Sequence, residues 1–282
     1  MLRLAPILIA LVAIGFLMVQ SCQDGPFGRR QHVALNPQQE AALGAQAFQE
    51  VLGEGQVVHG PLDEAVKSIT KRLADATLNP EFLRLTEQKP QEMAWEVRVL
   101  RSKEVNAFCL PGGKMVVYTG IVPVAQTNEG LAVVMGHEIS HALAHHGAER
   151  MMHQKIAQIG VAAAGASLGE LDVQQRMQIM QVLNAGATFG ILSYSRKHES
   201  EADRMGVLLM AAAGYDPRES IRFWERMAKI SGGKSPPEFM STHPSHETRI
   251  RDLEQEWIKP ALPLYDANPK KPPVRRLPGL GP

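Results

Sequence analysis

Two histidines four residues apart, with a glutamate beside the first, form the motif His137-Glu138-Ile139-Ser140-His141. In an α-helix this spacing returns to the same face about one turn along, so both imidazoles would project together and could bind one Zn²⁺ ion. Glu138 lies about 100° around the helix from His137, where its carboxylate could act as a general base toward water. The motif therefore predicts two metal ligands and one catalytic base.

A catalytic zinc site also needs a third protein ligand. Candidates follow at His198, Glu199 and Glu201, in a second predicted helix. Glu199 shares a helical face with Asp203 and with small residues that would allow close packing, so it is the preferred ligand, with Asp203 accepting a hydrogen bond from a ligating histidine. Glu201 lies about 200° around the helix from Glu199 and is expected to face solvent. His198 stays open as an alternative ligand.

The elements that must position these residues follow from apolar periodicity and from Gly and Pro punctuation. The pattern predicts three strands in a small antiparallel sheet, at 95–100, 105–110 and 114–119. Around it, helices are expected over 36–52, 62–76, 128–152, 199–213, 216–230 and 244–258. Residues 156–192 are predicted to form a helical hairpin over the core, with a hairpin dipping into a membrane as the alternative. The expected fold class is therefore α+β and mainly helical, with the sheet beside the zinc-binding helix.

The N-terminus carries an uncharged apolar run over 4–19 behind Arg3, which is typical of a secretory signal or a short membrane anchor. The run ends in Val19-Gln20-Ser21-Cys22, which resembles a bacterial lipobox and would make Cys22 the lipidated residue. An uncleaved anchor is the alternative. Either form would tether the chain to a membrane.

Domain boundaries follow from composition along the 282 residues. We expect a signal or anchor over 1–22, a polar linker over 23–35, one zinc metallopeptidase domain over 36–259 and a disordered Pro-rich tail over 260–282. The net charge of +1 gives no strong positive potential to attract the phosphates of nucleic acid, so nucleic-acid binding is not expected. Cys109 has no second cysteine in the mature domain and is expected to be a buried strand residue.

Several motifs in order resemble one family of peptidases. They are NAFCLPGGKMVVYTG, HEISHALAHH, SYSRKHESEADRMG, AAGYDP and THPSHETRI. Together they are similar to the gluzincin metallopeptidases of family 48, which include the HtpX, BepA, LoiP and CaaX prenyl proteases. The resemblance covers about residues 36–253, and the layout is most like that of a single-domain envelope lipoprotein.

This resemblance implies a zincin-like domain with one Zn²⁺ per chain. It implies that His137, His141 and Glu199 bind the metal, that Glu138 is the catalytic base, and that Asp203 is the carboxylate behind the ligands. The strand at Asn106 and Ala107 would pair with an extended substrate backbone.

The resemblance also gives His243 a role on a mobile loop, where it could stabilise an oxyanion or block the metal as a fourth ligand. Arg249 would pair with a carboxylate of the site. Four further histidines are expected at the surface; they are His145, His146, His153 and His246.

The main hypothesis is a membrane-tethered zinc endopeptidase on the periplasmic face of the cell envelope, which cleaves extended or misfolded polypeptides. Its partners would be polypeptide substrates and the membrane. A second hypothesis is a chaperone or assembly factor of the same fold with a latched or weakly active zinc site. A purely structural zinc site is disfavoured because such sites are usually closed and rich in cysteine.

Overall fold

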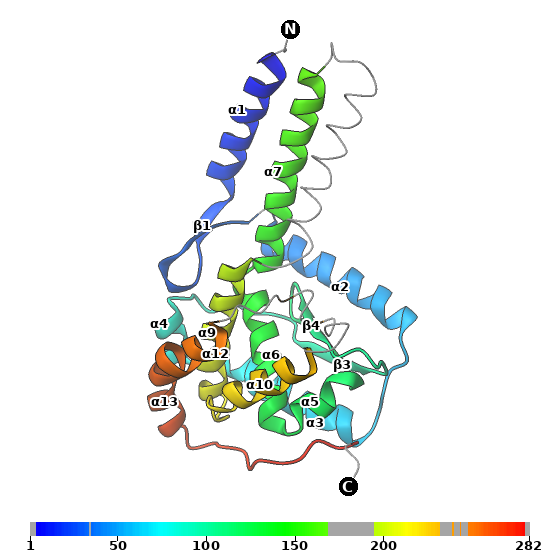
Figure 1. Ribbon diagram of the computed structural model, residues 1–282, viewed down its shortest axis with the longest axis vertical. Helices are drawn as coiled ribbons and strands as arrows, with labels where there is room; N and C mark the ends of the chain where they lie inside the picture. The colour runs from blue at the N-terminus through cyan, green and yellow to red at the C-terminus, as the bar shows by residue number, and fades with distance from the viewer. Residues whose placement is uncertain are drawn as a thin grey trace.

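Figure 1 shows the computed structural model, which describes residues 4–33, 35–168, 195–231, 239, 243 and 248–279. Helices surround a small sheet, as the expected α+β class requires. The longer helices are α1 (Leu4–Ser21), α2 (Pro37–Glu54), α3 (Pro61–Ala76), α6 (Asn128–Leu143), α7 (His146–Ser167), α9 (Arg196–Ala212) and α10 (Glu219–Ser231). Shorter helical segments are α4 (Pro80–Thr86), η2 (Thr119–Ile121), α5 (Val122–Ala125), α12 (Arg249–Asp252), the π-helical η3 (Leu253–Trp257) and α13 (Ile258–Asp266).

The central sheet is mixed rather than wholly antiparallel. Its strands β3 (Glu96–Leu100), β4 (Ala107–Leu110) and β5 (Lys114–Tyr118) lie in the order β3-β5-β4. A tight turn through Gly112 and Gly113, both with positive φ, makes β4 and β5 an antiparallel hairpin. Because β5 lies between the other two strands, β3 pairs with it in parallel. This order leaves β4 at one edge of the sheet, beside α6.

Helix α6 runs through the middle of the molecule and is buried from Glu129 to Leu143. It packs against α9 at a point where both helices carry glycine. A Cβ on Gly206 would lie 3.3 Å from the backbone nitrogen of His137, and one on Gly136 would lie 3.4 Å from the carbonyl oxygen of Gly206. The small residues thus let the two backbones approach closely, as the sequence of the α9 face predicted.

One long helix was expected over 128–152, but the structure divides it into α6 and α7. Helix α6 ends at Leu143, and His145 adopts a left-handed conformation with φ 55° before α7 begins at His146. His145 Nδ1 lies 3.0 Å from both carboxylate oxygens of Glu40 on α2. This break depends on a distant partner, so the apolar periodicity of the segment does not reveal it.

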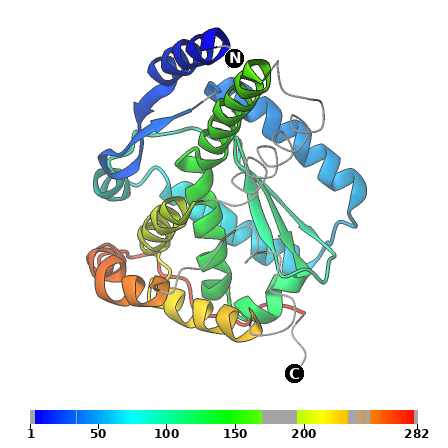
Figure 2. The ribbon, with the colours of Figure 1, turned by 45° about the horizontal axis from the view of Figure 1, so that its top comes forward.

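Most of the expected linker over 23–35 lies in an ordered hairpin over residues 22–32. Strands β1 (Cys22–Asp24) and β2 (Arg30–His32) pair antiparallel around the short turn η1 (Pro26–Gly28). Helices α1 and α7 lie side by side and extend away from the body, with the hairpin at the base of α1 (Figures 1 and 2). The second half of the expected helical hairpin, over 177–192, lies outside the described residues.

Residues 260–279 are ordered, although a disordered tail was expected over 260–282. The last helices continue through α13 to Asp266, well past the predicted end at 258. Beyond it the chain runs along the body to the start of α6, where Leu277 is buried and donates its N–H to the carbonyl oxygen of Gln126 at 2.9 Å. Proline suits an extended backbone, and the burial of Ala261 and Leu277 supplies the apolar contacts that hold this segment in place.

Candidate metal centre

The two histidines of the motif project from one face of α6. The helix begins at a cap, because the Thr127 hydroxyl accepts a hydrogen bond from the N–H of Gly130 at 3.1 Å. One turn apart, His137 and His141 direct their Nε2 atoms to the same point, 3.1 Å from each other. Both side chains are buried.

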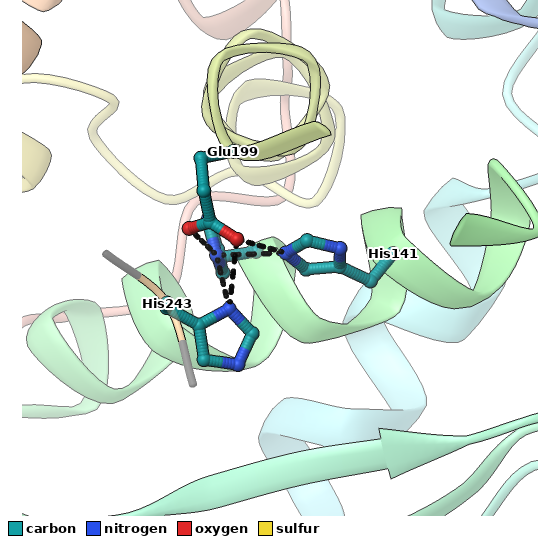
Figure 3. Close-up of side chains that lie close together, drawn as sticks. His141, Glu199 and His243 are labelled. Carbon is teal, nitrogen blue, oxygen red and sulfur yellow. Dashed lines mark hydrogen bonds and ion pairs between the residues drawn. The ribbon is translucent and has the colours of Figure 1, made fainter. Parts of the chain in front are cut away.

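Glu199 reaches this point from α9, whose N-terminus is capped by Ser195 (Figure 3). Its carboxylate oxygens lie 3.4 Å from Nε2 of His137 and 3.4 Å from Nε2 of His141. Burial alone would raise the pKa of Glu199, but the three surrounding histidines lower it well below its usual range. The carboxylate is therefore ionised and offers oxygen ligands to a cation.

His243 completes a set of four donors. Its Nδ1 lies 3.1 Å from Glu199 Oε1 and 3.4 Å from His137 Nε2 (Figure 3). The ring stacks on Phe239, with centroids 4.5 Å apart and planes at 19°.

These four donors fit a tetrahedral metal site. Ligands at 2.0–2.1 Å from a tetrahedral zinc ion lie about 3.3 Å from one another. Five of the six pairs of these side chains bring donor atoms to 3.1–3.4 Å from each other, with one or the other carboxylate oxygen of Glu199 taking part. Three imidazoles and one carboxylate are also a donor set that zinc accepts, so the cluster His137, His141, Glu199 and His243 could hold this metal.

The carboxylate of Asp203 and the guanidinium of Arg249 support the ligand His137. Asp203 Oδ1 lies 2.9 Å from His137 Nδ1, and Arg249 donates from Nε to Asp203 Oδ2 at 2.6 Å. Arg249 also donates to Glu199 Oε2 at 2.8 Å and lies over the ring of Trp224. Burial lowers the pKa of His137, but Asp203 and Glu199 outweigh it and raise that pKa to about 10 in the metal-free protein.

Glu138 stands beside the cluster rather than in it. Burial raises the pKa of its carboxyl group, against the opposing effect of His243 and His137. The backbone N–H of Cys109, on β4, hydrogen-bonds this carboxylate, and His243 Nε2 lies 3.5 Å from Oε1. Oε1 is buried, and within the described part of the chain nothing hydrogen-bonds it. A buried carboxylate oxygen in this position suits a general base.

Strand β4 lies at the edge of the central sheet, next to the zinc-binding helix α6. Ala107 pairs with Val117 of β5 on the inner side, and the carbonyl oxygen of Asn106 accepts from the N–H of Tyr118 at 3.1 Å. Asn106 and Ala107 are both buried. The hydrogen bond from Cys109 connects this strand to Glu138, which stands beside the cluster.

The structure corrects the interpretation of two polar residues. His146, expected at the surface, is completely buried, and its Nδ1 lies 2.8 Å from His141 Nδ1. Glu201, expected in solvent, accepts from Arg29 and lies 2.7 Å from His146 Nε2. Burial would raise the pKa of Glu201, but His146 and Arg29 lower it. No local pattern could have found these contacts, because they depend on the break at His145 and on the N-terminal hairpin.

Four other histidines of the predicted domain differ in their positions. His145 is partly buried against Glu40, so its expected surface position is only partly correct. His153 is exposed on α7 as expected, and His246 lies outside the described residues. His198, the alternative ligand, points away from the cluster and lies 3.0 Å from Glu149 Oε2.

Comparison with known proteins supports the interpretation of the site. The model of Peptidase family M48 matches residues 63–257. Mitochondrial metalloendopeptidase OMA1 of Schizosaccharomyces pombe is 41% identical over 172 residues, covering 60% of this chain and 48% of the relative. The human metalloendopeptidase OMA1 is 35% identical over 171 residues, covering 58% of this chain and 32% of the relative. The beta-barrel assembly-enhancing protease of Escherichia coli is 27% identical over 220 residues, covering 76% and 43%. The chain thus spans about half or less of the length of these relatives.

Proposed function

The chain belongs to peptidase family M48, and from this membership and the four-donor cluster we propose that it is a zinc-dependent endopeptidase. The match agrees with the family that the motifs resembled. The observation that carries the proposal is a buried cluster of His137, His141 and Glu199 at zinc-site spacing, with Glu138 beside it.

Each residue of the site has a separate role in peptide hydrolysis. Zinc at this cluster would supply Lewis-acid polarisation of the scissile carbonyl and activation of water. Glu138 takes the proton from the attacking water and passes it to the leaving amine. His243 Nε2, which faces Glu138, is placed to donate a hydrogen bond to the oxyanion. Asp203 and Arg249 hold His137 and Glu199 in position.

The substrate we propose is an extended segment of a misfolded or damaged polypeptide. An extended backbone can add to the edge strand β4, at Ala107 and the preceding Asn106, through main-chain hydrogen bonds, which do not depend on side-chain sequence. Such pairing favours unfolded segments over compact domains.

Cleavage of unfolded casein by the purified full-length chain tests this function. Glu138→Gln should abolish turnover while the zinc content stays near one per chain, because it removes the base and leaves the ligands in place. Glu64→Gln, on the exposed face of α3, is the matched control and should cleave at the wild-type rate. Wild-type turnover by Glu138→Gln would refute the proposal.

We further propose that the enzyme is tethered to the membrane of a cell envelope with its domain outside the cytoplasm. Within the described residues, α1 is the one helix long and apolar enough to cross a bilayer. Its 18 residues span about 27 Å, close to the hydrocarbon thickness of about 30 Å. Its exposed side chains are largely aliphatic, which suits contact with lipid.

Two forms of tether are distinguished by one experiment. The packing of α1 along α7 supports a retained helix, whereas the lipobox-like sequence supports cleavage and lipidation at Cys22. Mass spectrometry of the mature chain separates the two. Cys22→Ser should leave a retained helix in the membrane fraction unchanged, and it should block processing if Cys22 is lipidated. A wild-type chain that washes off the membrane would exclude both forms.

The position of His243 favours a second candidate function. As a fourth donor it could close the metal site, so the chain could act as a chaperone or assembly factor with a latched centre. His243→Ala should then increase cleavage if the residue is a latch, and decrease it if the residue stabilises the oxyanion. If the chaperone function is the one that cells need, Glu138→Gln should still support it.

A further inference from the structure

The outer nitrogen of His141 faces another histidine, whereas that of His137 faces a carboxylate. His141 Nδ1 lies 2.8 Å from Nδ1 of His146, and His137 Nδ1 lies 2.9 Å from Asp203. Histidines that bind metals generally donate this N–H to an acceptor that holds the ring in one tautomer and orientation. His146 must therefore be an acceptor if His141 is to bind a metal through Nε2.

Only one placement of hydrogens satisfies this requirement. A bond between the two Nδ1 atoms has one hydrogen to share, and it must stay on His141 so that His141 Nε2 has its lone pair for the metal. His146 then accepts at Nδ1 and carries its own hydrogen on Nε2. Nε2 lies 2.7 Å from Glu201 Oε2, and a carboxylate accepts that hydrogen. Glu201 thus selects the tautomer of His146, and through it the tautomer of His141.

Glu201 is held in turn by Arg29. The guanidinium donates from Nε and from Nη2 to the Glu201 carboxylate at 2.9–3.1 Å. Its third nitrogen, Nη1, donates to both oxygens of Glu149 at 2.9 Å. Glu149 holds His198, whose ring stacks on His146 with centroids 4.4 Å apart. One arginine therefore fixes both the hydrogen-bond acceptor and the stacking partner of His146.

Arg29 comes from a part of the chain outside the match to the family model. It lies between η1 and β2 in the hairpin that follows α1, whereas the match begins at residue 63. Its side chain is 28% exposed, while Glu201 and Glu149 are almost completely buried. The hairpin thus inserts one cationic side chain into a buried acidic pair behind the metal cluster.

We propose that Arg29 is a positioning residue of the metal site, which acts through Glu201 and His146 to orient His141, so that metal binding depends on the hairpin beside the membrane helix. We call Arg29, Glu201 and His146 the His146 relay. The proposal rests on the proposed zinc site, because the relay has a purpose only if His141 binds a metal.

The test measures zinc affinity of the full-length chain in detergent, by competition with a chromophoric chelator. Arg29→Ala should weaken zinc binding about tenfold, the lower end of the range for residues behind metal ligands. It should also change the visible absorption of the Co²⁺-loaded protein, which reports ligand geometry. Arg29→Lys should restore part of the affinity, because an ammonium group keeps the charge but makes no two-point contact.

Arg30→Ala is the matched control. Arg30 is the next residue in the same hairpin, its side chain is 65% exposed, and it pairs with Asp24. This variant should keep the wild-type zinc affinity and Co²⁺ spectrum. If Arg29→Ala lowers thermal stability but leaves both properties unchanged, Arg29 is merely structural and the proposal is wrong.

A second variant covers the case in which Arg29→Ala does not fold. Glu201→Gln keeps the shape of the side chain, but its amide can turn either its oxygen or its NH₂ group toward His146 Nε2. The tautomer of His146 is then no longer fixed, so the variant should also weaken zinc binding and alter the Co²⁺ spectrum. Wild-type behaviour of Glu201→Gln would overturn the relay. A wild-type chain that takes up no stoichiometric zinc would instead refute the proposed function itself, and that result is visible without any variant.

Discussion

His137 and His141 stand one helical turn apart on α6, yet the groups behind them come from different regions of the molecule. His137 is supported directly by Asp203, which Arg249 holds, and both residues lie within the match to the family model. His141 is supported indirectly, through the His146 relay: His146 contacts Glu201, and Glu201 is held by Arg29 of the N-terminal hairpin. The difference indicates that one ligand depends on groups within the family match and the other on the hairpin that follows α1.

The two supports also differ in electrostatics. Asp203 places a carboxylate against His137 and raises its pKa. His141 faces a neutral imidazole, and burial lowers its pKa well below the usual value, although Glu199 opposes the effect. In the metal-free protein His137 is therefore protonated and His141 is not. The same helix thus presents one ligand that must lose a proton to bind a metal and one that is ready to bind.

Removal of the direct support should have the largest effect. Asp203→Ala leaves Arg249 buried with a single carboxylate, and breaking a buried ion pair on one side costs about 3–5 kcal/mol of unfolding free energy. Zinc affinity should fall about 10- to 100-fold. Denaturant unfolding and chelator competition measure the two losses. Asp75→Ala, which removes an exposed pair with Lys71, should cost about 1 kcal/mol or less. Equal losses of unfolding free energy in the two variants would show that the Asp203–Arg249 pair stabilises the fold no more than an exposed ion pair does.

A change at the crossing of α6 and α9 should disturb both supports at once. Gly206→Ala places a Cβ 3.3 Å from the backbone nitrogen of His137, tighter than ordinary contact, so the helices must separate slightly. Such overpacking costs about 1–3 kcal/mol of stability. We expect weaker zinc binding than in the wild type and a changed Co²⁺ spectrum. Gly160→Ala on α7, where an added Cβ meets nothing within 4 Å, is the control and should have neither effect.

Local sequence patterns predicted one support and missed the other for a physical reason. The spacing of His137 and His141 and the small face of α9 are local properties, so helix geometry puts the two histidines on one face and puts Glu199 and Asp203 together on a face that can pack closely against it. The His146 relay joins residues 172 positions apart at its Arg29–Glu201 contact and depends on a left-handed residue at His145. The ordered C-terminal segment was missed in the same way, because its contacts with the start of α6 are tertiary.

The protonation difference predicts a proton count for zinc binding. The pKa of His137 is raised to about 10, so at pH 7.5 the metal-free protein holds a proton that zinc must displace. About one proton should be released per zinc, and affinity should rise about tenfold per pH unit as pH increases toward 10. Calorimetry in buffers of different ionisation enthalpy measures the release. Without zinc, the His137–Asp203 pair stabilises the fold below about pH 6.5, and this contribution is lost as pH rises through 10.

Two variants should show which of the two histidine ligands releases the proton. Asp203→Asn removes the carboxylate that raises the pKa of His137, so its proton release at pH 7.5 should fall. Glu201→Gln acts on the His141 side and should leave the release near one proton. If Glu201→Gln abolished the release instead, the assignment of the proton to His137 would be wrong.

The smallest effect we predict is the coupling between the two supports. Asp203→Asn and Glu201→Gln act on different ligands through groups with no shared hydrogen-bond partner among the described residues. Their losses in zinc-binding free energy should therefore add to within about 0.5 kcal/mol in the double variant. A larger coupling would mean that the ligands respond as one unit, because the metal itself or the α6 backbone transmits the change. Additivity would instead show that the hairpin adjusts metal binding through His141 alone, without altering the His137 side of the site.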